Sequence, residues 1–476
     1  MDGHEITELN LSSLERTKRI DAEFYKKGNL AVDITLSAWN KKSIAECFHV
    51  SDGNHMSIAD SFCEDGIPYY RGQDIYHLFI ENASPLMIDR ATFDKAQMHR
   101  SHLKKGDILM SIVGAIVGNS AMVTSDNPAT CSCKLSIMRS KDNGITPELL
   151  LVYIKTRYGQ VQIQKFKRGA AQTGLLLEDF DQLFVPVFGY EFQSCVSQTV
   201  RMIYKYMQRA VSSYATAQHN LDTAIGVNTH PNGQAISVKT ITNSFVETGR
   251  LDAEYYHPKY DILFDTLKNF PCKLLGGHDG IARFKKSIEP GSEAYRDEGI
   301  PFVRVSDVSK FEITQPEIYL SQDVSENVAS LFPKKDTILF SKDGSVGIAY
   351  KLECDENIIT SGALLHLTVR NTKEILPDYL TLVLNSPIVQ LQAERASNGA
   401  IIQHWKPSEI ENVIIPVLDI DKQKELAEMV QKSFALRRQS KQLLEYAKQA
   451  VEMAIEQGED AALAWLKEKM GEQNDE

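Results

Sequence analysis

The clearest hydrophobic pattern in the chain is an apolar seam between positions 196 and 221. Apolar side chains recur there at alternating intervals of four and three residues, the heptad spacing of a helix that packs along one stripe. The pattern predicts a long helix over residues 191–226, and the turn at Pro231-Asn232-Gly233 predicts a linker after it. The seam consists of Val196, Val200, Ile203, Met207, Ala210, Tyr214, Ala217 and Leu221.

A second long helix is predicted over residues 419–457. When the first seam is moved along by 230 residues, its ends are apolar but its middle is polar, with Ser433, Arg437 and Ser440 at seam positions. Phe434, Leu436 and Leu443 indicate a local change of register or a second contact face. The expected packing positions are Leu426, Val430, Leu444 and Val451.

The order of motifs occurs twice, at an offset close to 230 residues. A repeat this long is not a solenoid, whose periods are far shorter. It predicts two copies of one domain with an internal pseudo-two-fold, so the two long helices are expected to pack antiparallel. The repeated motifs are R-I-D-A-E-F-Y at 19–25 and R-L-D-A-E-Y-Y at 250–256, G-I-P-Y-Y-R at 66–71 and G-I-P-F-V-R at 299–304, and V-P-V at 185–187 and I-P-V at 415–417.

Within each copy, short apolar runs separated by Gly, Asp and Asn predict β-strands and turns, including buried strands at 108–110 and 338–340. Helical patterns follow Pro147 and Pro377, because proline suits the first turn of a helix. The predicted fold is α+β: two mixed α/β domains in tandem, separated by a pair of long antiparallel coiled-coil helices. The predicted segments are a first domain at 1–190, a central helix at 191–226, a second domain at 227–418, a distal helix at 419–457 and an acidic C-terminal tail at 458–476.

Composition describes an ordinary globular protein, since 43% of the residues are hydrophobic and 24% are charged. No apolar run approaches the roughly 20 residues of a membrane helix. The first eleven residues are polar and acidic, unlike a secretory signal. We therefore predict a cytoplasmic protein with no membrane partner. The seven cysteines are scattered, which predicts idle thiols in a reducing compartment.

The net charge of −11 argues against wholesale coating of nucleic acid, but the charge is unevenly distributed. Residues 452–476 hold eight acids and two lysines, a local charge of −6. Residues 94–170 hold twelve Lys and Arg against five acids, a local +7, whereas the matching residues 324–400 hold seven against nine, a local −2. The first copy is therefore expected to present a basic face that the second lacks.

The usual catalytic signatures are absent from the sequence. It contains no phosphate loop, no dinucleotide fingerprint, no zinc-protease helix and no nucleophile elbow. His99 and His102 form a close pair without an obvious third metal ligand. Together these absences favour a binding subunit with no catalytic residue and no metal on this chain.

Two polar loops recur at matched positions. Residues 111–114 and 341–344 each follow a predicted strand and carry glycine, which either forms a positive-φ turn or lets the backbone approach a phosphate. Residues 165–172 and 395–400 mix cations with amides, which contact phosphate, guanine or adenine. A solvated loop remains an alternative, as does structural salt bridging by Arg71 and Arg304. The candidate DNA-binding residues are Arg71, Gln73, Lys104, Lys105, Lys165, Lys167, Arg168, Gln172, Arg304, Ser306, Lys342, Arg395, Asn398, Gln403 and His404.

Taken in order, the repeated motifs resemble the specificity subunit of type I restriction-modification systems. The resemblance covers nearly the whole chain. It implies two target-recognition domains, 1–190 and 227–418, and a helical spacer. It implies a non-catalytic subunit that binds a bipartite double-stranded DNA sequence, one half per domain, with an unread gap set by the helices. The segment from Val196 to Leu221 would be about 39 Å long at roughly 1.5 Å per residue, close to the roughly 34–36 Å of one DNA turn.

The resemblance also implies the partners of the chain. They are two methyltransferase (modification) subunits, which bring S-adenosylmethionine for adenine methylation, and restriction motor subunits in phage defence. The chain itself would hold no cofactor. Because the second copy lacks a basic excess and its seam is interrupted, an asymmetric target is expected rather than a palindrome. Two alternatives remain open: a specificity subunit of a related restriction or phage-defence assembly, and a pseudo-symmetric protein-protein scaffold, which the acidic balance favours.

Overall fold

The computed structural model divides into two compact units. Unit 1 comprises Met1–Met207 and Arg438–Glu476, and unit 2 comprises Gln208–Arg437. The long helix α7 (Tyr190–Ile225) has its first half in unit 1 and its second half in unit 2, and α12 (Ile420–Gln457) has the reverse. The structure describes residues 5–12, 14, 19–80, 84–169, 173–227, 236–325, 327–397 and 403–474.

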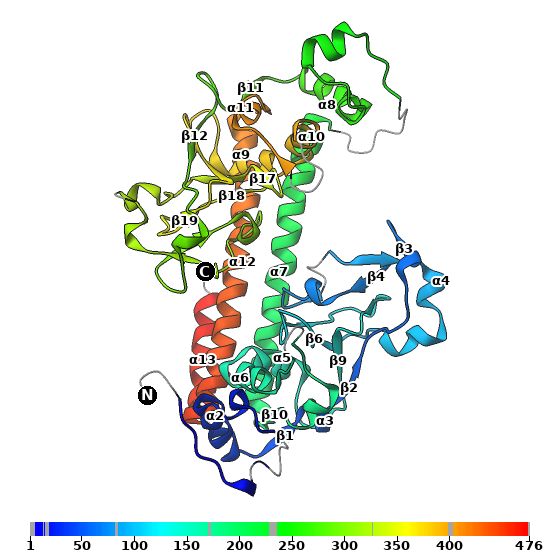
Figure 1. Ribbon diagram of the computed structural model, residues 1–476, viewed down its shortest axis with the longest axis vertical. Helices are drawn as coiled ribbons and strands as arrows, with labels where there is room; N and C mark the ends of the chain where they lie inside the picture. The colour runs from blue at the N-terminus through cyan, green and yellow to red at the C-terminus, as the bar shows by residue number, and fades with distance from the viewer. Residues whose placement is uncertain are drawn as a thin grey trace. The chain divides into compact units, whose positions relative to one another are not determined.

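Among its described residues, unit 1 forms three small sheets (Figure 1). The first has the order β2-β9-β6-β7 and is antiparallel throughout. Its strand β6 is buried along its whole length, because its sequence Ile-Leu-Met-Ser carries no charge. The second sheet has the order β3-β5-β4-β8, with β4 and β8 parallel, and the third pairs β1 with β10. The strands are β1 (Lys41–Ser43), β2 (Phe48–Asp52), β3 (Phe62–Cys63), β4 (Ile67–Tyr70), β5 (Leu86–Ile88), β6 (Ile108–Ser111), β7 (Ser120–Met122), β8 (Thr130–Cys131), β9 (Leu135–Ser140) and β10 (Phe184–Pro186).

The helix predicted after Pro147 forms as expected. Thr146 caps it by accepting a hydrogen bond from the Leu149 amide at 3.2 Å, and Pro147 occupies the first turn. Six of its nine residues are buried, so it is a core helix of unit 1. Helix α6 is amphipathic, α3 and α4 are single turns, and α2 buries Leu36 near its end. The helices of this part are α2 (Lys27–Ser37), α3 (Ile44–Cys47), α4 (Arg90–Phe93), α5 (Pro147–Lys155) and α6 (Arg157–Phe166).

Unit 2 repeats the sheets of unit 1 in the same strand order. Its first sheet is β12-β20-β16-β18, its second is β13-β15-β14-β19 with a parallel β14-β19 pair, and its third is β11-β22. An additional pair joins β17 to β21. The strands are β11 (Cys272–Leu274), β12 (Ala282–Lys286), β13 (Tyr295–Arg296), β14 (Ile300–Val303), β15 (Tyr319–Leu320), β16 (Ile338–Ser341), β17 (Asp343–Gly344), β18 (Ala349–Lys351), β19 (Ile359–Thr360), β20 (Leu364–Val369), β21 (Gln403–His404) and β22 (Ile414–Pro416).

The short helices of unit 2 also match those of unit 1. Helix α9 begins at Pro377, as predicted, and buries seven of its eight residues. The predicted α+β class and the duplication are thereby confirmed: both units are mixed α/β and share one strand order. The helices are α8 (Pro258–Leu267), α9 (Pro377–Leu384), α10 (Pro387–Ala396) and α11 (Pro407–Glu411).

Within each unit, the halves of α7 and α12 run antiparallel. In unit 2 the Ser433 hydroxyl donates to the Ala210 carbonyl at 2.7 Å, and the Ser213 hydroxyl donates to the Met429 carbonyl at 2.8 Å. In unit 1 the Ser440 hydroxyl donates to the Ile203 carbonyl at 3.5 Å. Two seam serines of α12 therefore bond directly to the backbone of α7, which explains why the middle of that seam is polar.

The predicted packing positions divide between two cores. Val196, Val200, Ile203 and Val451 are buried in unit 1, and Tyr214, Leu221, Leu426 and Val430 are buried in unit 2. Met207 is half-buried. Leu444 is also only half-buried, whereas its neighbour Leu443 is fully buried. Phe434, Leu436 and Leu443 are all buried, so α12 has the wider contact face that the sequence left open.

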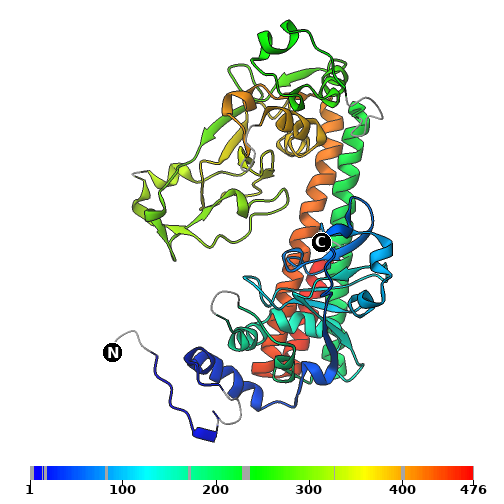
Figure 2. The same ribbon diagram turned by 45° about the vertical axis from the view of Figure 1, so that its right-hand side comes forward.

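The acidic segment after residue 457 is a helix, which its charge did not suggest. Gly458, at φ 99°, separates α12 from α13 (Glu459–Asn474). Helix α13 lies beside the end of α12 in both views (Figure 1, Figure 2). It buries Ala462 and Leu466 in the core of unit 1, and the Trp465 ring packs edge-on against Tyr446 at 5.6 Å. The acidic segment therefore also carries apolar residues that pack in the core.

One buried histidine makes the stability of unit 2 depend on pH. His366 on β20 is 5% exposed and hydrogen-bonds through Nε2 to the Thr360 hydroxyl at 2.8 Å. Burial, with the charge of Lys285, lowers the pKa of His366 from 6.5 to about 4. An unfolded chain therefore takes up this proton at a higher pH than the folded chain. The stability that neutral His366 contributes is complete above pH 6.5 and is lost as the pH falls toward 4.

We expect the free energy of unfolding of unit 2 to fall with this titration by up to about 3 kcal/mol. The substitution His366→Gln should remove that part of the pH dependence while keeping a partner for Thr360. Chemical denaturation of both proteins at pH 7 and at pH 4.5 measures the difference. Equal losses of stability in the two proteins would contradict the assignment.

Candidate nucleic-acid interface

The repeated R-[IL]-D-A-E-[FY]-Y motif forms a closed turn in each unit. Arg19 pairs with Asp21 at 2.6 Å, and the Tyr25 hydroxyl donates to the Arg19 carbonyl at 3.1 Å. Residues 250–256 repeat both contacts, at 2.6 and 3.0 Å. The arginine beside each motif carboxylate holds the pKa of Asp21 and that of its counterpart below the usual range. The motif is therefore a structural element whose charges are satisfied locally.

Two of the predicted DNA-binding cations are anchored on this motif. The Lys165 ammonium lies 4.3 Å from the centre of the Phe24 ring and pairs with Asp33. The Arg395 guanidinium lies 4.3 Å from the Tyr255 ring, and its Nε donates to the Tyr255 carbonyl at 3.3 Å. Lys165 is only 8% exposed. These cations stack on equivalent aromatic rings, and in the described geometry they stabilise the fold rather than extend into solvent.

The segment after α6 has one cation that is free of such contacts. Arg168 pairs with the buried carboxylate of Asp179, and its backbone pairs with Gly174 in both directions. Lys167 is half-exposed and has no carboxylate at ion-pair distance among the residues that the structure describes. Gln172 lies outside the described residues. Lys167 is therefore the cation of this segment with its charge available to a ligand.

In each unit the structure joins the loop after the buried strand to residues that follow the second recurring segment. In unit 1 the Gly114 amide donates to the Thr173 carbonyl, and the Leu175 amide donates to the Ile112 carbonyl, both at 2.9 Å. In unit 2, β17 pairs with β21, and the Trp405 amide donates to the Lys342 carbonyl at 2.8 Å. We call each such pair of loops a loop junction. The sequence identified the first loop of each pair, whereas the residues bonded to it, 173–175 and 403–405, follow the recurring segments at 165–172 and 395–400.

Glycine is required at these junctions by backbone conformation. Gly114 has a φ of 103° and Gly344 a φ of 75°, in the region that other residues rarely adopt. A methyl group at either position would meet nothing within 4 Å, so crowding is not the reason for glycine. The positive-φ interpretation is confirmed for both loops.

The junction of unit 2 carries a compact polar set. Asp343 pairs with Lys342 and with Nδ1 of His404, the latter at 2.9 Å. Gln403 and His404 are exposed on β21. Asn398 lies outside the described residues. The junction therefore offers one cation, one imidazole and one amide around a single carboxylate.

The matched arginines after β4 and β14 make the local ion pairs that the sequence left open. Arg71 Nε lies 3.1 Å from Asp74, whose carboxylate also accepts from the Arg71 amide at 2.8 Å. The Arg304 amide donates to Asp307 at the same distance, 2.8 Å. The neighbouring Gln73 and Ser306 are exposed, and the Ser306 hydroxyl donates to Asp307 at 3.1 Å. Each turn thus presents a polar side chain beside a paired arginine.

Lys104 and Lys105 lie at the opposite end of β6 from the junction of unit 1. Both are exposed, and their amides donate to Asp107 at 2.8 Å and to Asp126 at 3.1 Å. The four residues of β6, about 13 Å of extended chain, separate them from the Ser111 loop. The candidate cations of unit 1 therefore fall into two separate groups.

Repeated glutamines were missed in the sequence although the duplication contained the signal. Gln193 on α7 accepts from the Thr146 amide at 3.1 Å and donates to the Phe188 and Gly144 carbonyls at 2.8 Å. Gln423, 230 residues later on α12, makes the same three kinds of contact with Leu376, Leu418 and Glu374. A search for identical polar residues at the offset would have found this pair. Each glutamine fixes the start of a long helix to the loop before a core helix.

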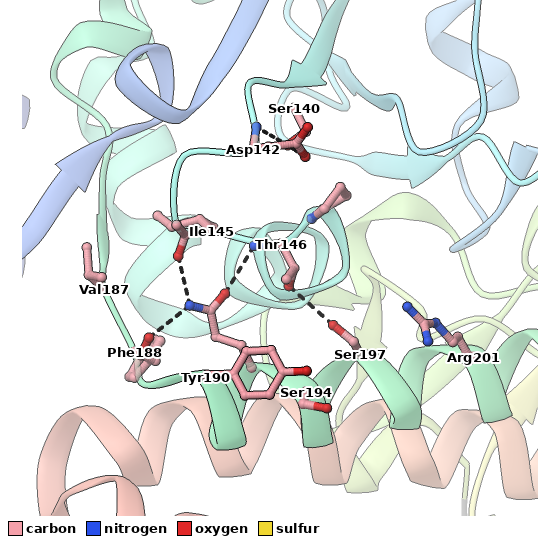
Figure 3. A pocket seen from close by; sticks show the side chains of 13 residues that line it. Ser140, Asp142, Ile145, Thr146, Val187, Phe188, Tyr190, Ser194, Ser197 and Arg201 are labelled. Atoms are coloured by element: carbon pink, nitrogen blue, oxygen red, sulfur yellow. Dashed lines mark hydrogen bonds between the residues drawn. The ribbon is translucent and has the colours of Figure 1, made fainter.

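A crevice of about 610 Å³ lies beside Gln193 in unit 1. Figure 3 shows Thr146 and Ser197 pointing toward one another across its floor, and their hydroxyls lie 3.2 Å apart. Tyr190 is 85% exposed at its edge. The sequence did not indicate this crevice, which forms only where the loop before α5 meets α7.

Among the described residues, no group of three His, Cys, Asp or Glu side chains could hold a metal ion. The paired histidines have local contacts instead: His102 stacks on Phe93 with ring centres 3.8 Å apart, and His99 lies 5.2 Å from His102. No helix in the described parts of the chain combines the length and the apolar character of a membrane span.

No protein-family model matches the chain, and no curated protein matches it in sequence. Solved structures do match it over nearly their whole length. A type I restriction-modification S subunit from M. genitalium is 14% identical with a TM-score of 0.38, and the match covers 90% of this chain and 96% of that chain. The HsdS subunit from Thermoanaerobacter tengcongensis is 16% identical with a TM-score of 0.30, covering 88% and 97%.

A third match is a chain described under complex assembly and conformational transition of the type I R-M system. It is 16% identical with a TM-score of 0.29, and the match covers 89% of this chain and 97% of that chain. These structures are of the class that the repeated motifs resemble. Because all three TM-scores are below 0.5, the functional proposal rests on the residues of this chain.

Proposed function

We propose that the chain is the DNA sequence-specificity subunit of a type I restriction-modification complex. The observation that carries the proposal is the duplicated loop junction. Each unit joins the loop after a buried strand to the segment after its second core helix, with cations and amides on or beside the joined loops. Two non-identical copies of one polar junction suit a DNA target with two different halves.

In this proposal the units divide recognition between them. Phosphate contacts by Lys167 and by the exposed pair Lys104 and Lys105 position unit 1 on the duplex, since phosphate contacts carry no sequence information. Exposed side chains such as Gln73, and Gln403 and His404 in unit 2, read base edges. The chain is non-catalytic and binds no cofactor. Two methyltransferase subunits, which hold S-adenosylmethionine, modify adenine, and motor subunits complete the restriction complex.

Genomic adenine-methylation mapping tests the function. Cells with the intact system should show one bipartite, asymmetric methylated motif that disappears when this chain is deleted and returns when it is restored. A complex of this chain with its methyltransferase subunits should bind a duplex with that motif in preference to a scrambled one. Failure to bind any duplex would instead favour the pseudo-symmetric scaffold, which the acidic net charge favours. The identity of the proteins that copurify with the chain would distinguish a type I complex from a related restriction or phage-defence assembly.

Lys167→Ala should weaken DNA binding by the assembled complex on every sequence. Affinity falls as salt rises, and removal of one phosphate contact makes the slope of log affinity against log salt less steep by about 0.9. The single variant is a sharper test than a double change with Arg168, because Arg168→Ala would leave the buried Asp179 carboxylate unpaired. Titration of the complex with target and unrelated duplexes at several salt concentrations measures the slope.

Lys27→Ala provides the matched control for Lys167→Ala, because Lys27 is an exposed lysine of the same unit. It should leave the slope unchanged. Equal slopes for wild type and Lys167→Ala would place Lys167 away from the DNA.

A further inference from the structure

Two cations in unit 2 share one aromatic ring. The Arg437 guanidinium lies 3.7 Å from the centre of the Phe311 ring, and the Lys310 ammonium lies 5.1 Å from the same centre. The ring also packs edge-on against Tyr214 of α7 at 4.9 Å. Lys310 and Phe311 belong to a loop closed by the bridge between Val308 and Ile313. The loop thus places a second positive charge beside a cation of α12.

These two charges are not neutralised by an ion pair. Within the part of the chain that the structure describes, neither Lys310 nor Arg437 has a carboxylate at ion-pair distance, and the buried Arg437 Nε has no hydrogen-bond partner. Burial lowers the pKa of both groups, and the charge of Arg437 lowers that of Lys310 further. The charge of Glu312, the next residue of the loop, acts on the pKa of Arg437 in the opposite direction. Two like charges beside one ring are unfavourable until an anion joins them.

The cation pair is an addition to a contact that both units share. In unit 1 the Phe79 ring packs edge-on against Tyr204 of α7 at 5.0 Å. Tyr204 corresponds to Phe434, which lies 6.3 Å from Phe311 in unit 2. The position that corresponds to Arg437 holds Met207, which carries no charge. An aromatic contact alone therefore suffices to hold this loop on a long helix, and packing does not require the cations.

The cation pair also bears on two differences between the copies: the polar seam of the second long helix and the missing basic excess of the second copy. Arg437 occupies a seam position of α12 where an apolar residue was expected, and its side chain leaves the seam for Phe311. The second copy has a local charge of −2 over residues 324–400, but both Lys310 and Arg437 lie outside that range. Unit 2 therefore has two neighbouring cations that the count of charged residues over 324–400 did not include.

We propose that Lys310 and Arg437 form a phosphate-binding site of unit 2 that holds the backbone of duplex DNA. The inference rests on the proposed function. Stacking on Phe311 holds the planar guanidinium in one orientation, and Arg binds phosphate through paired N–H groups. Lys310 is exposed and supplies the second charge. Its loop follows the turn of Arg304 and Ser306, so a phosphate held at Lys310 would place that turn for base contact.

The test uses the complete complex with its methyltransferase subunits and a duplex that contains the methylated motif. Lys310→Gln and Arg437→Gln should each make the slope of log affinity against log salt less steep by about 0.9. The double variant should make it less steep by about twice that. Target and unrelated duplexes should lose affinity by the same factor. Lys432→Gln is the matched control, because Lys432 is an exposed lysine of the same helix; its slope should equal that of the wild type.

A charge-preserving variant separates phosphate binding from simple packing. Arg437→Lys should keep most of the wild-type slope while losing affinity, because the charge remains and the planar fork is lost. If the pair only packs the loop on the helix, all Arg437 variants lower the thermal stability of unit 2 and none changes the slope. That result would overturn the phosphate-binding site and leave the proposed function standing. If the wild-type complex binds no duplex, the proposed function fails together with this site.

Discussion

Insertion of seven residues into both long helices, where each passes between units, should lengthen the gap between methylated half-sites and leave both half-site sequences unchanged. The insertion points are Met207/Gln208 in α7 and Arg437/Arg438 in α12. Seven residues add about 10 Å of helix at roughly 1.5 Å per residue, which is about three base pairs at 3.4 Å each. Two helical turns nearly preserve the packing face, so each unit keeps its core.

The residues at both insertion points belong to neither of the two main cores. An insertion after Leu221 alone, at the end of the seam, would disturb the core of unit 2. Leu221 is fully buried in unit 2, and Ile225 behind it belongs to the same core. An insertion there would move a buried side chain as well as the spacing, so loss of methylation would have two causes. Insertion at the boundaries leaves the core of each unit intact.

Methylation mapping of cells that carry the doubly extended protein measures the outcome. The original motif should lose methylation almost completely, and a motif with the same halves and a wider gap should replace it. A substitution of seven residues for seven at the same points is the control, and it should keep the original gap. An unchanged gap in the extended protein would refute the spacing role of the helices.

The substitution Leu466→Ala should cost about 2–5 kcal/mol of the stability of unit 1, since a fully buried leucine is removed from a packed site. Leu466 is 0% exposed on α13, in the same core as Val196 and Leu443. The end of α12 next to it is held by further contacts: the Trp39 indole donates to the Ile455 carbonyl at 3.2 Å, and the Arg157 amide donates to Glu452 at 2.7 Å. Loss of α13 packing should therefore reach the whole of unit 1.

Thermal unfolding followed by limited proteolysis measures where the loss occurs. Cleavage sites in residues 19–207 should become accessible at lower temperature, while those in 236–437 stay protected. Lys467→Ala, an exposed change on the same helix, is the control and should leave unfolding within about 0.5 kcal/mol of wild type. If Leu466→Ala behaves like Lys467→Ala, α13 does not contribute to the core as its burial indicates.

Much of the architecture follows from patterns that are local in the chain. The heptad seam at 196–221 predicted α7 because helical periodicity depends only on residues three and four apart. Pro147 and Pro377 marked helix starts because proline fixes its own backbone angle. The 230-residue offset predicted a second unit with the same elements, and the sheets have the same strand order in both.

Other features depended on neighbours that are distant in sequence. Lys165 and Arg395 looked like surface cations, but each lies on an aromatic ring about 140 residues away. The polar middle of the α12 seam looked like an interruption, and it contains serines bonded to the α7 backbone. The sequence cannot distinguish a cation stacked on a ring from one in solvent, because the residue type is the same in both cases.

The sequence by itself determined the duplication, the α+β class, the two long helices and the glycines that require positive φ, since each depends on local spacing or on one residue's backbone freedom. Tertiary structure decided which polar residues are available. It joined the two loops of each junction, paired Arg168 with Asp179, and moved Arg437 from the seam to Phe311. The reason is that a charge is neutralised by its nearest neighbours in space, and folding chooses those neighbours from the whole chain.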